Sequence, residues 1–68
     1  MSACASVNGE SVELIPGTTV ADIVGTLTGG GRGVAVARNG EVVPRSEWGT
    51  TVVKAEDRIE VLTAAQGG

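Results

Sequence analysis

Two Asn-Gly dipeptides constrain this chain more than any other feature: Asn8-Gly9 and Asn39-Gly40. Asn-Gly is typical of a type I′ turn, because both central residues of that turn need a positive φ. Apolar and polar residues alternate around the turns, which is the pattern of strands with one buried face. The sequence therefore predicts two β-hairpins, within residues 4–14 and 34–43, whose inward-facing residues are Ala5, Val7, Val12, Leu14, Val34 and Val36.

The segment between the hairpins predicts one short helix. Thr19 is a good N-cap, and Asp22, three residues later, completes a weak capping box. The apolar residues then follow helical spacing and form one stripe, made of Val20, Ile23, Val24 and Leu27. Pro16-Gly17 ends the preceding strand, and the glycine-rich residues 29–33 end the helix.

The remaining residues complete an α+β arrangement. "RSEW" and Gly49 predict a turn or a single helical turn after Pro44, and residues 58–63 predict a last strand. In that strand Ile59, Val61 and Thr63 face the helix, and Leu62 points to the opposite face. A last strand that arrives after a crossover can pair with the first strand in the middle of the sheet. The prediction is thus a β-grasp fold, in which a mixed sheet of about five strands carries one helix on one face.

Composition excludes several classes of function. Sixty-eight residues allow one domain with a small core. Cys4 is the single cysteine and histidine is absent, so an intramolecular disulfide and Cys/His metal spacings are excluded. A net charge of −3 and 1% aromatic residues argue against nucleic-acid binding. No apolar run approaches the ~20 residues of a membrane span, and no signal peptide is recognisable. A single free thiol fits a reducing compartment, so a cytoplasmic protein is expected, and it is expected to be a monomer when free.

The side chains form no recognisable catalytic constellation. "GGGRG" follows a helix, whereas a phosphate-binding loop precedes one, so a flexible connection is expected. Cys4 has no histidine to activate it and is expected to be a small apolar filler. Trp48 is expected to anchor a small satellite core, with a contact patch shared with Arg45 as the alternative. Solvated surface positions are expected for the acidic residues near turns, namely Glu10, Glu41, Glu47, Glu56 and Asp57.

Nearly the whole chain resembles the ThiS family, the sulfur carrier of thiamine biosynthesis. The resemblance rests on "VNGE", "GTTVADIV", "GVAVARNGEVVPRSEW" and "DRIEVLTAAQGG". It implies a ubiquitin-like β-grasp fold and a functional diglycine, Gly67-Gly68. It also implies that an adenylating enzyme of the ThiF/MoeB type activates the Gly68 carboxylate with ATP and magnesium. The resulting thiocarboxylate would deliver sulfur to thiazole synthase (ThiG), so the carrier itself would be neither an enzyme nor a cofactor-binding protein.

Two residues depart from the family pattern, and both belong to the scaffold. Glu56 stands where the family commonly has a turn glycine, and Arg38 where it commonly has an aliphatic residue. Neither departure touches the tail that the resemblance makes functional.

The chemistry of the tail agrees with this resemblance. We expect a folded domain over residues 1–63 and a flexible tail over 64–68, which includes Ala65 and Gln66. Glycines at its end lack Cβ atoms and can enter the narrow channel of an activating enzyme. Leu62, at the root of this tail, is expected to form a partner-binding patch with Ala35 and Ala37 on the face of the sheet opposite the helix.

Three other functions share some of these features. A sulfur carrier for molybdopterin or cysteine synthesis would have the same fold and diglycine, and "NGEVVPRSEW" favours the thiamine branch. A ubiquitin-like protein modifier would begin with the same activation of the tail. A β-grasp interaction module would have no chemistry at all. Iron–sulfur ferredoxins of this fold are excluded because the chain has one cysteine.

Overall fold

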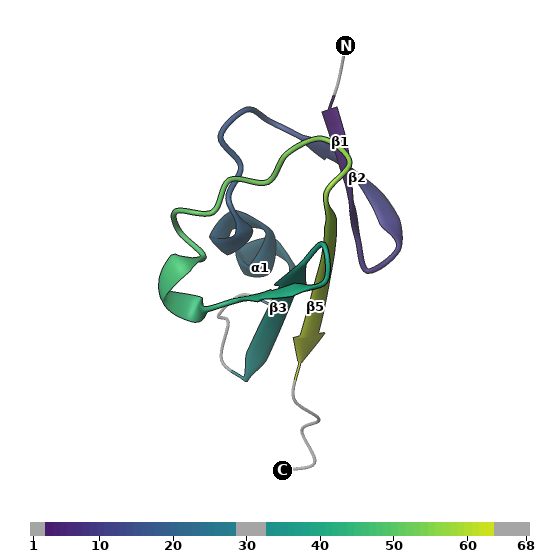
Figure 1. Cartoon of the computed structure of the whole chain (residues 1–68). Coiled ribbons are helices and arrows are strands. Elements are labelled where there is room, and N and C mark those ends of the chain that lie inside the picture. The colour runs from purple at the N-terminus through teal and green to yellow at the C-terminus, as the bar shows by residue number, and fades with distance from the viewer. Residues whose placement is uncertain (1–2, 29–32, 64–68) are drawn as a thin grey trace.

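The computed structural model describes residues 3–28 and 33–63, and it confirms the predicted order of elements (Figure 1). Two hairpins flank the helix, and a crossover with one 3₁₀ turn leads to the last strand. The elements are β1 (Ala3–Val7), β2 (Glu10–Leu14), α1 (Val20–Thr28), β3 (Val34–Arg38), β4 (Glu41–Val43), the 3₁₀ turn η1 (Arg45–Glu47) and β5 (Arg58–Thr63). Gly33, the last residue of the segment predicted to end the helix, has a φ of 67°.

The five strands form one mixed sheet in the order β2-β1-β5-β3-β4. The central pair, β1 and β5, is parallel, and the other neighbouring strands are antiparallel. Helix α1 lies against one face of the sheet (Figure 1). This is the predicted β-grasp fold, with the last strand in the middle of the sheet beside the first.

Both Asn-Gly turns have the backbone that the sequence predicts. Asn8 and Asn39 each have a φ of 53°, and Gly9 and Gly40 each have a φ of 87°. Positive φ at both central residues defines a type I′ turn, whose twist matches that of the strands it joins. The turns therefore fix the register of each hairpin, Val7 opposite Glu10 and Arg38 opposite Glu41.

Reciprocal hydrogen bonds begin α1, as predicted. The Thr19 N–H donates to Asp22 Oδ2 over 3.0 Å, and the Asp22 N–H donates to Thr19 Oγ1 over 3.2 Å. The crossover satisfies two more N–H groups of the first turn, since Val20 donates to the Thr51 carbonyl and Ala21 to the Trp48 carbonyl. The start of the helix is thus attached to the crossover by its backbone, which fixes α1 over the sheet.

One continuous core lies between α1 and the sheet. Its buried members are Ala5, Val7, Val20, Ile23, Val24, Val36, Val43, Trp48, Val53, Ile59 and Val61. The prediction of a satellite core for Trp48 is wrong, because its ring belongs to this main cluster and its Nε1 donates to the Val43 carbonyl over 2.9 Å. The prediction for Leu27 is also wrong, since 53% of its surface is exposed. Thr63 lies opposite Val34 on the helix side, as predicted, although it is exposed at the end of the strand.

Candidate functional site

Strand β5 leads into the segment that the sequence predicts to be functional. Ala65, Gln66, Gly67 and Gly68 lie outside the described residues, as does the predicted boundary between domain and tail. The described part of the candidate site is therefore the end of β5 and the face of the sheet around it. In Figure 1 this strand runs through the middle of the sheet toward the C-terminal end of the chain.

Leu62 faces away from the helix, as predicted. It is 67% exposed, while its neighbour Val61 is 7% exposed and packs in the core. Ala35 lies opposite Leu62 in the β3–β5 register, and Ala37 lies opposite Glu60. Since directly paired residues share a face of the sheet, the three residues of the predicted patch stand together on the open face.

Two further residues of the open face change the description of the patch. Cys4 is exposed, as its alternation with the inward-facing Ala5 predicts, so the expectation that it acts as a small apolar filler is wrong. Val42 lies opposite Ala37 and is 76% exposed, which makes it the most exposed large apolar side chain among the described residues. The predicted patch lacks Val42, although the alternation of Val42 with the buried Val43 places it on the outer face. The patch, defined as Leu62, Ala35, Ala37 and Val42, thus spans β5, β3 and β4.

A polar margin lies along β5 beside the patch. Arg58, Glu60 and Leu62 project to the same face by strand alternation, and they line a shallow hollow of about 450 Å³ together with Ser6, Asn8 and Gly9. A surface of this kind, apolar in the middle and charged at its rim, is typical of a protein-binding site.

The side chain of Asn8 ties the end of β5 to the first hairpin. Its Nδ2 donates to the Val61 carbonyl over 3.2 Å, and its Oδ1 accepts from the Val61 N–H over 2.8 Å. The Asn8 N–H also donates to the Ile59 carbonyl over 2.9 Å. Strand β1 ends at Val7, and the side-chain amide of Asn8 then makes the hydrogen bonds to β5 that the backbone of a further strand residue would make. These bonds hold the backbone of Val61, the residue before Leu62, in place.

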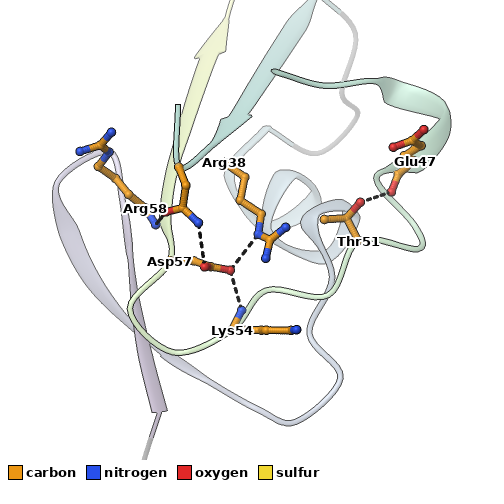
Figure 2. Close-up of polar contacts among 7 residues, drawn as sticks. Arg38, Glu47, Thr51, Lys54, Asp57 and Arg58 are labelled. Carbon is orange, nitrogen blue, oxygen red and sulfur yellow. Dashed lines mark hydrogen bonds and ion pairs between the residues drawn. The ribbon is translucent and has the colours of Figure 1, made fainter. Parts of the chain in front are cut away.

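Asp57 is buried, which contradicts the predicted solvated position. Only 7% of its surface is exposed, whereas the other acidic residues placed near turns are exposed. Figure 2 shows its carboxylate between Arg38 and Lys54. Arg38 Nε donates to Oδ2 over 2.9 Å, the Lys54 N–H donates to the same oxygen over 2.8 Å, and Asn39 Nδ2 donates to Oδ1 over 2.9 Å.

These donors determine the ionisation of Asp57. Burial of the carboxylate by itself raises its pKa, but the hydrogen bonds from Lys54, Asn39 and Arg38 and the charge of Arg38 together hold the pKa below its ordinary value of 3.8. The carboxylate is therefore ionised at neutral pH and accepts hydrogen bonds with both oxygens. Asp57 joins the second hairpin to the start of β5 and has a structural role.

The remaining candidates have no geometry for catalysis. Trp48 is buried, so only Arg45 of the predicted pair reaches the surface, with its guanidinium 5.5 Å from the centre of the indole ring. Within residues 3–28 and 33–63, no three Cys, His, Asp or Glu side chains are placed to hold a metal ion. Within the same residues, no helix is long and apolar enough to cross a membrane.

Comparison with known proteins identifies the family. The sequence model of the ThiS family matches residues 5–68. The chain belongs to the ThiS family. A crystal structure of the thiamine biosynthesis protein ThiS from Geobacter metallireducens superimposes with a TM-score of 0.72 at 30% identity, covering 96% of this chain and 99% of that one. The fold and the resemblance noted in the sequence are thereby confirmed.

A second relative is a longer protein. The thiazole synthase of Paramagnetospirillum magneticum (strain ATCC 700264 / AMB-1) is 36% identical over 62 residues, which is 91% of this chain. The chain spans only 19% of that relative. A protein named thiazole synthase therefore contains a segment similar to this member of the ThiS family.

Both departures from the family pattern have a structural counterpart. Glu56 has a φ of 70°, a left-handed conformation that glycine adopts more readily. Arg38 forms an ion pair with Asp57 and so supplies the cation that neutralises a buried carboxylate.

Proposed function

We propose that this protein is the sulfur carrier of thiamine biosynthesis and that the carboxylate of Gly68 is the group that carries sulfur. The observation that supports this most strongly is the match to the ThiS family, which extends through Gly68. The related segment within a thiazole synthase supports the receiving enzyme as a partner. The protein acts as a co-substrate of its partner enzymes.

The proposed chemistry has two steps. A carboxylate oxygen of Gly68 attacks the α-phosphorus of ATP in the adenylating enzyme, pyrophosphate leaves, and an acyl-adenylate forms. A sulfur nucleophile at the oxidation level of sulfide then attacks the acyl carbon, and AMP leaves with the C–O bond electrons. The product is a thiocarboxylate. ATP and magnesium are bound by the partner, and this chain contributes the acyl group.

The open face of the sheet is the proposed contact for the adenylating enzyme. The tail follows Thr63 directly, so an enzyme that surrounds Gly68 must also approach the end of β5. There it meets Leu62, which is 67% exposed, and the small side chains of Ala35 and Ala37. A large apolar residue among small ones gives a flat surface that a partner can cover closely.

The experiment is enzymatic conversion of the purified chain. The protein, first shown by mass to end at Gly68, is incubated with Mg-ATP, an adenylating enzyme of the ThiF type and sulfide. We expect an intact-mass increase equal to the exchange of one oxygen for sulfur, located on Gly68 by fragmentation. A chain that lacks Gly68 serves as the control. Conversion of that control, or a modification elsewhere, would contradict the proposal.

Addition of thiazole synthase then distinguishes the competing destinations. We expect the thiocarboxylate to revert to the carboxylate as sulfur is transferred to the thiazole product. Transfer only to a molybdopterin or cysteine pathway enzyme would keep the carrier role and overturn the thiamine assignment. An isopeptide bond between Gly68 and a protein lysine would instead identify a protein modifier.

A further inference from the structure

Strand β2 presents an open edge of the sheet. It is the outermost strand of the order β2-β1-β5-β3-β4, and its register with β1 runs without interruption from Glu10 to Leu14. Because a two-residue turn joins β1 to β2, Val7 and Glu10 form a hydrogen-bonded pair, and bonding to β1 alternates from there. The backbone N–H and C=O groups of Ser11 and Glu13 therefore point away from the sheet.

The two edges of the sheet differ in how they are protected. Strand β4 has three residues, and Pro44 follows it directly, which limits any further pairing on that side. Strand β2 has five residues and contains no proline, lysine or bulge. An edge of this length with free backbone groups is a template for an added strand.

An apolar hollow adjoins this edge. It has a volume of about 380 Å³ and lies between β2, the connection that follows it, and α1. Val12 and Ile15 are 37% and 75% exposed there. The residues that form its apolar wall are Val12, Leu14, Ile15, Pro16 and Ile23. The hollow is large enough for an aliphatic side chain from an added strand.

The charged side chains of β2 itself are both acidic, and among the described residues Lys54 is the one basic residue that lines a hollow beside the end of this strand, with Leu14 and Ile15. The first 31 residues contain no lysine or arginine, and all five basic residues lie within 32–58. Glu10 is paired with Val7 on the helix side, Glu13 is paired with Cys4 on the open face, and Asp22 lines the hollow. Carboxylates thus stand on both sides of β2. A second copy of this edge would bring like charges together, which disfavours pairing between copies.

We propose that the edge of β2 binds an extended, basic segment of a partner protein, which adds to the sheet as a further strand. Backbone groups of Ser11 and Glu13 hold the segment. An aliphatic side chain fills the hollow on the helix side, and lysine or arginine residues face Glu13 on the open face. The segment is defined by alternation of basic and aliphatic residues, because successive side chains of a strand point to opposite faces.

This surface is separate from the proposed tail site. Leu14 pairs with Ala3, which lies three residues before Ser6 in β1. Ser6 lies opposite Arg58 in β5, and Thr63 lies five residues after Arg58. At about 3.3 Å per residue, the two ends are about 25 Å apart. Figure 1 likewise shows the connection from β2 to α1 at the opposite end of the molecule from the end of β5. Both surfaces can therefore be occupied at once.

A peptide titration of the full chain tests the proposal. The probe is the capped heptapeptide Lys-Val-Lys-Val-Lys-Val-Lys, added to the ¹⁵N-labelled protein. One control peptide has glutamate in place of lysine, and a second is N-methylated at alternate residues so that it keeps charge but loses backbone donors. We expect amide shifts confined to residues 10–18 and 22–26. The variant Glu13→Gln should weaken binding about two- to fivefold, with added salt acting in the same direction.

Every other outcome overturns the proposal. The absence of shifts at millimolar peptide would show that the edge does not accept a strand. Equal binding of the N-methylated peptide would show that charge attracts the peptide without backbone pairing to β2. Equal binding of the glutamate peptide would show that charge complementarity does not contribute to binding. Shifts at β4 or Leu62 would place the site elsewhere. Dimerisation of the free protein through β2 would make a second copy the occupant. The Gly68 conversion assay is independent of all these results.

Discussion

At the scale of single residues, Asp57 is the side chain that depends most on its neighbours. Its carboxylate is buried, and it accepts hydrogen bonds from Arg38, Asn39 and the Lys54 N–H. Because its pKa is lower in the folded chain than the ordinary 3.8, folding favours the ionised form. The stabilisation is complete at pH values above the unfolded pKa and is lost as the pH falls through the folded pKa.

The first prediction follows from that pH dependence. Asp57→Asn should lower the free energy of unfolding by about 1–3 kcal/mol at pH 7. The reason is that the new NH₂ group is a donor and would face the donors of Arg38, Asn39 and the Lys54 N–H. The difference from the wild type should shrink as the pH falls below the ordinary pKa of 3.8 and through the lower pKa of the folded chain, since the wild-type carboxylate becomes protonated. Urea denaturation at a series of pH values measures this. A difference that is constant with pH would show that the charge of Asp57 is unimportant.

The second prediction concerns Glu56. Its φ of 70° places an ordinary L-residue in the left-handed region, which costs about 1–2 kcal/mol. Glycine avoids that cost but loses about 0.5–1 kcal/mol through the entropy of the unfolded chain. Glu56→Gly should therefore raise the free energy of unfolding by about 0.5–1 kcal/mol. Ala55→Gly is the control and should not stabilise the protein. A Glu56→Gly variant that is less stable would contradict this account.

At the scale of elements, the two Asn-Gly turns also attach the hairpins to β5. Asn8 bonds both backbone groups of Val61, and Asn39 accepts from the Arg58 N–H while donating to Asp57. Local sequence predicts the turns but not these bonds, because their partners are 53 and 19 residues away. Each asparagine therefore provides both the positive φ of its turn and a contact with the central strand.

The third prediction separates these two roles. Asn8→Gly keeps the positive φ but removes both bonds to Val61, so it should lower the free energy of unfolding by about 1–3 kcal/mol. Hydrogen exchange at the Val61 amide should become faster than in the wild type. Asn39→Gly is the matched variant and should affect the Arg58 amide instead. If Val61 exchange is unchanged in Asn8→Gly, the side chain does not hold the end of β5.

The limits of prediction from sequence follow the same distinction between local and distant contacts. Turns, the capping box and strand alternation depend on neighbouring residues, so the elements and both faces of β5 could be predicted. Burial of Asp57 depends on Arg38, which is distant in the sequence. Local spacing placed Leu27 in the stripe, but which turn of α1 meets the sheet depends on the position of the whole helix. Val42 belongs to the patch only because β4 lies beside β3.

At the scale of the whole molecule, the fold separates stability from recognition. The core between α1 and the sheet contains the large buried side chains, whereas Leu62 and Val42 stand on the opposite face and are 67% and 76% exposed. A substitution on the open face can therefore change partner binding while the core stays intact. The acidic edge at β2 lies away from this patch and is available to a different partner.

The last prediction uses this separation to test the patch. Leu62→Asp should leave the domain folded and cost less than about 1 kcal/mol of stability, because the side chain packs outside the core. It should weaken binding to the adenylating enzyme by about 1–3 kcal/mol, since it places a charge in a desolvated contact. Leu27→Asp is the control, because that leucine is 53% exposed on the helix layer. Circular dichroism and a binding titration on the same samples decide the matter. Unfolding of Leu62→Asp would mean that the two faces of β5 are exchanged, and a folded variant with unchanged affinity would move recognition away from the patch.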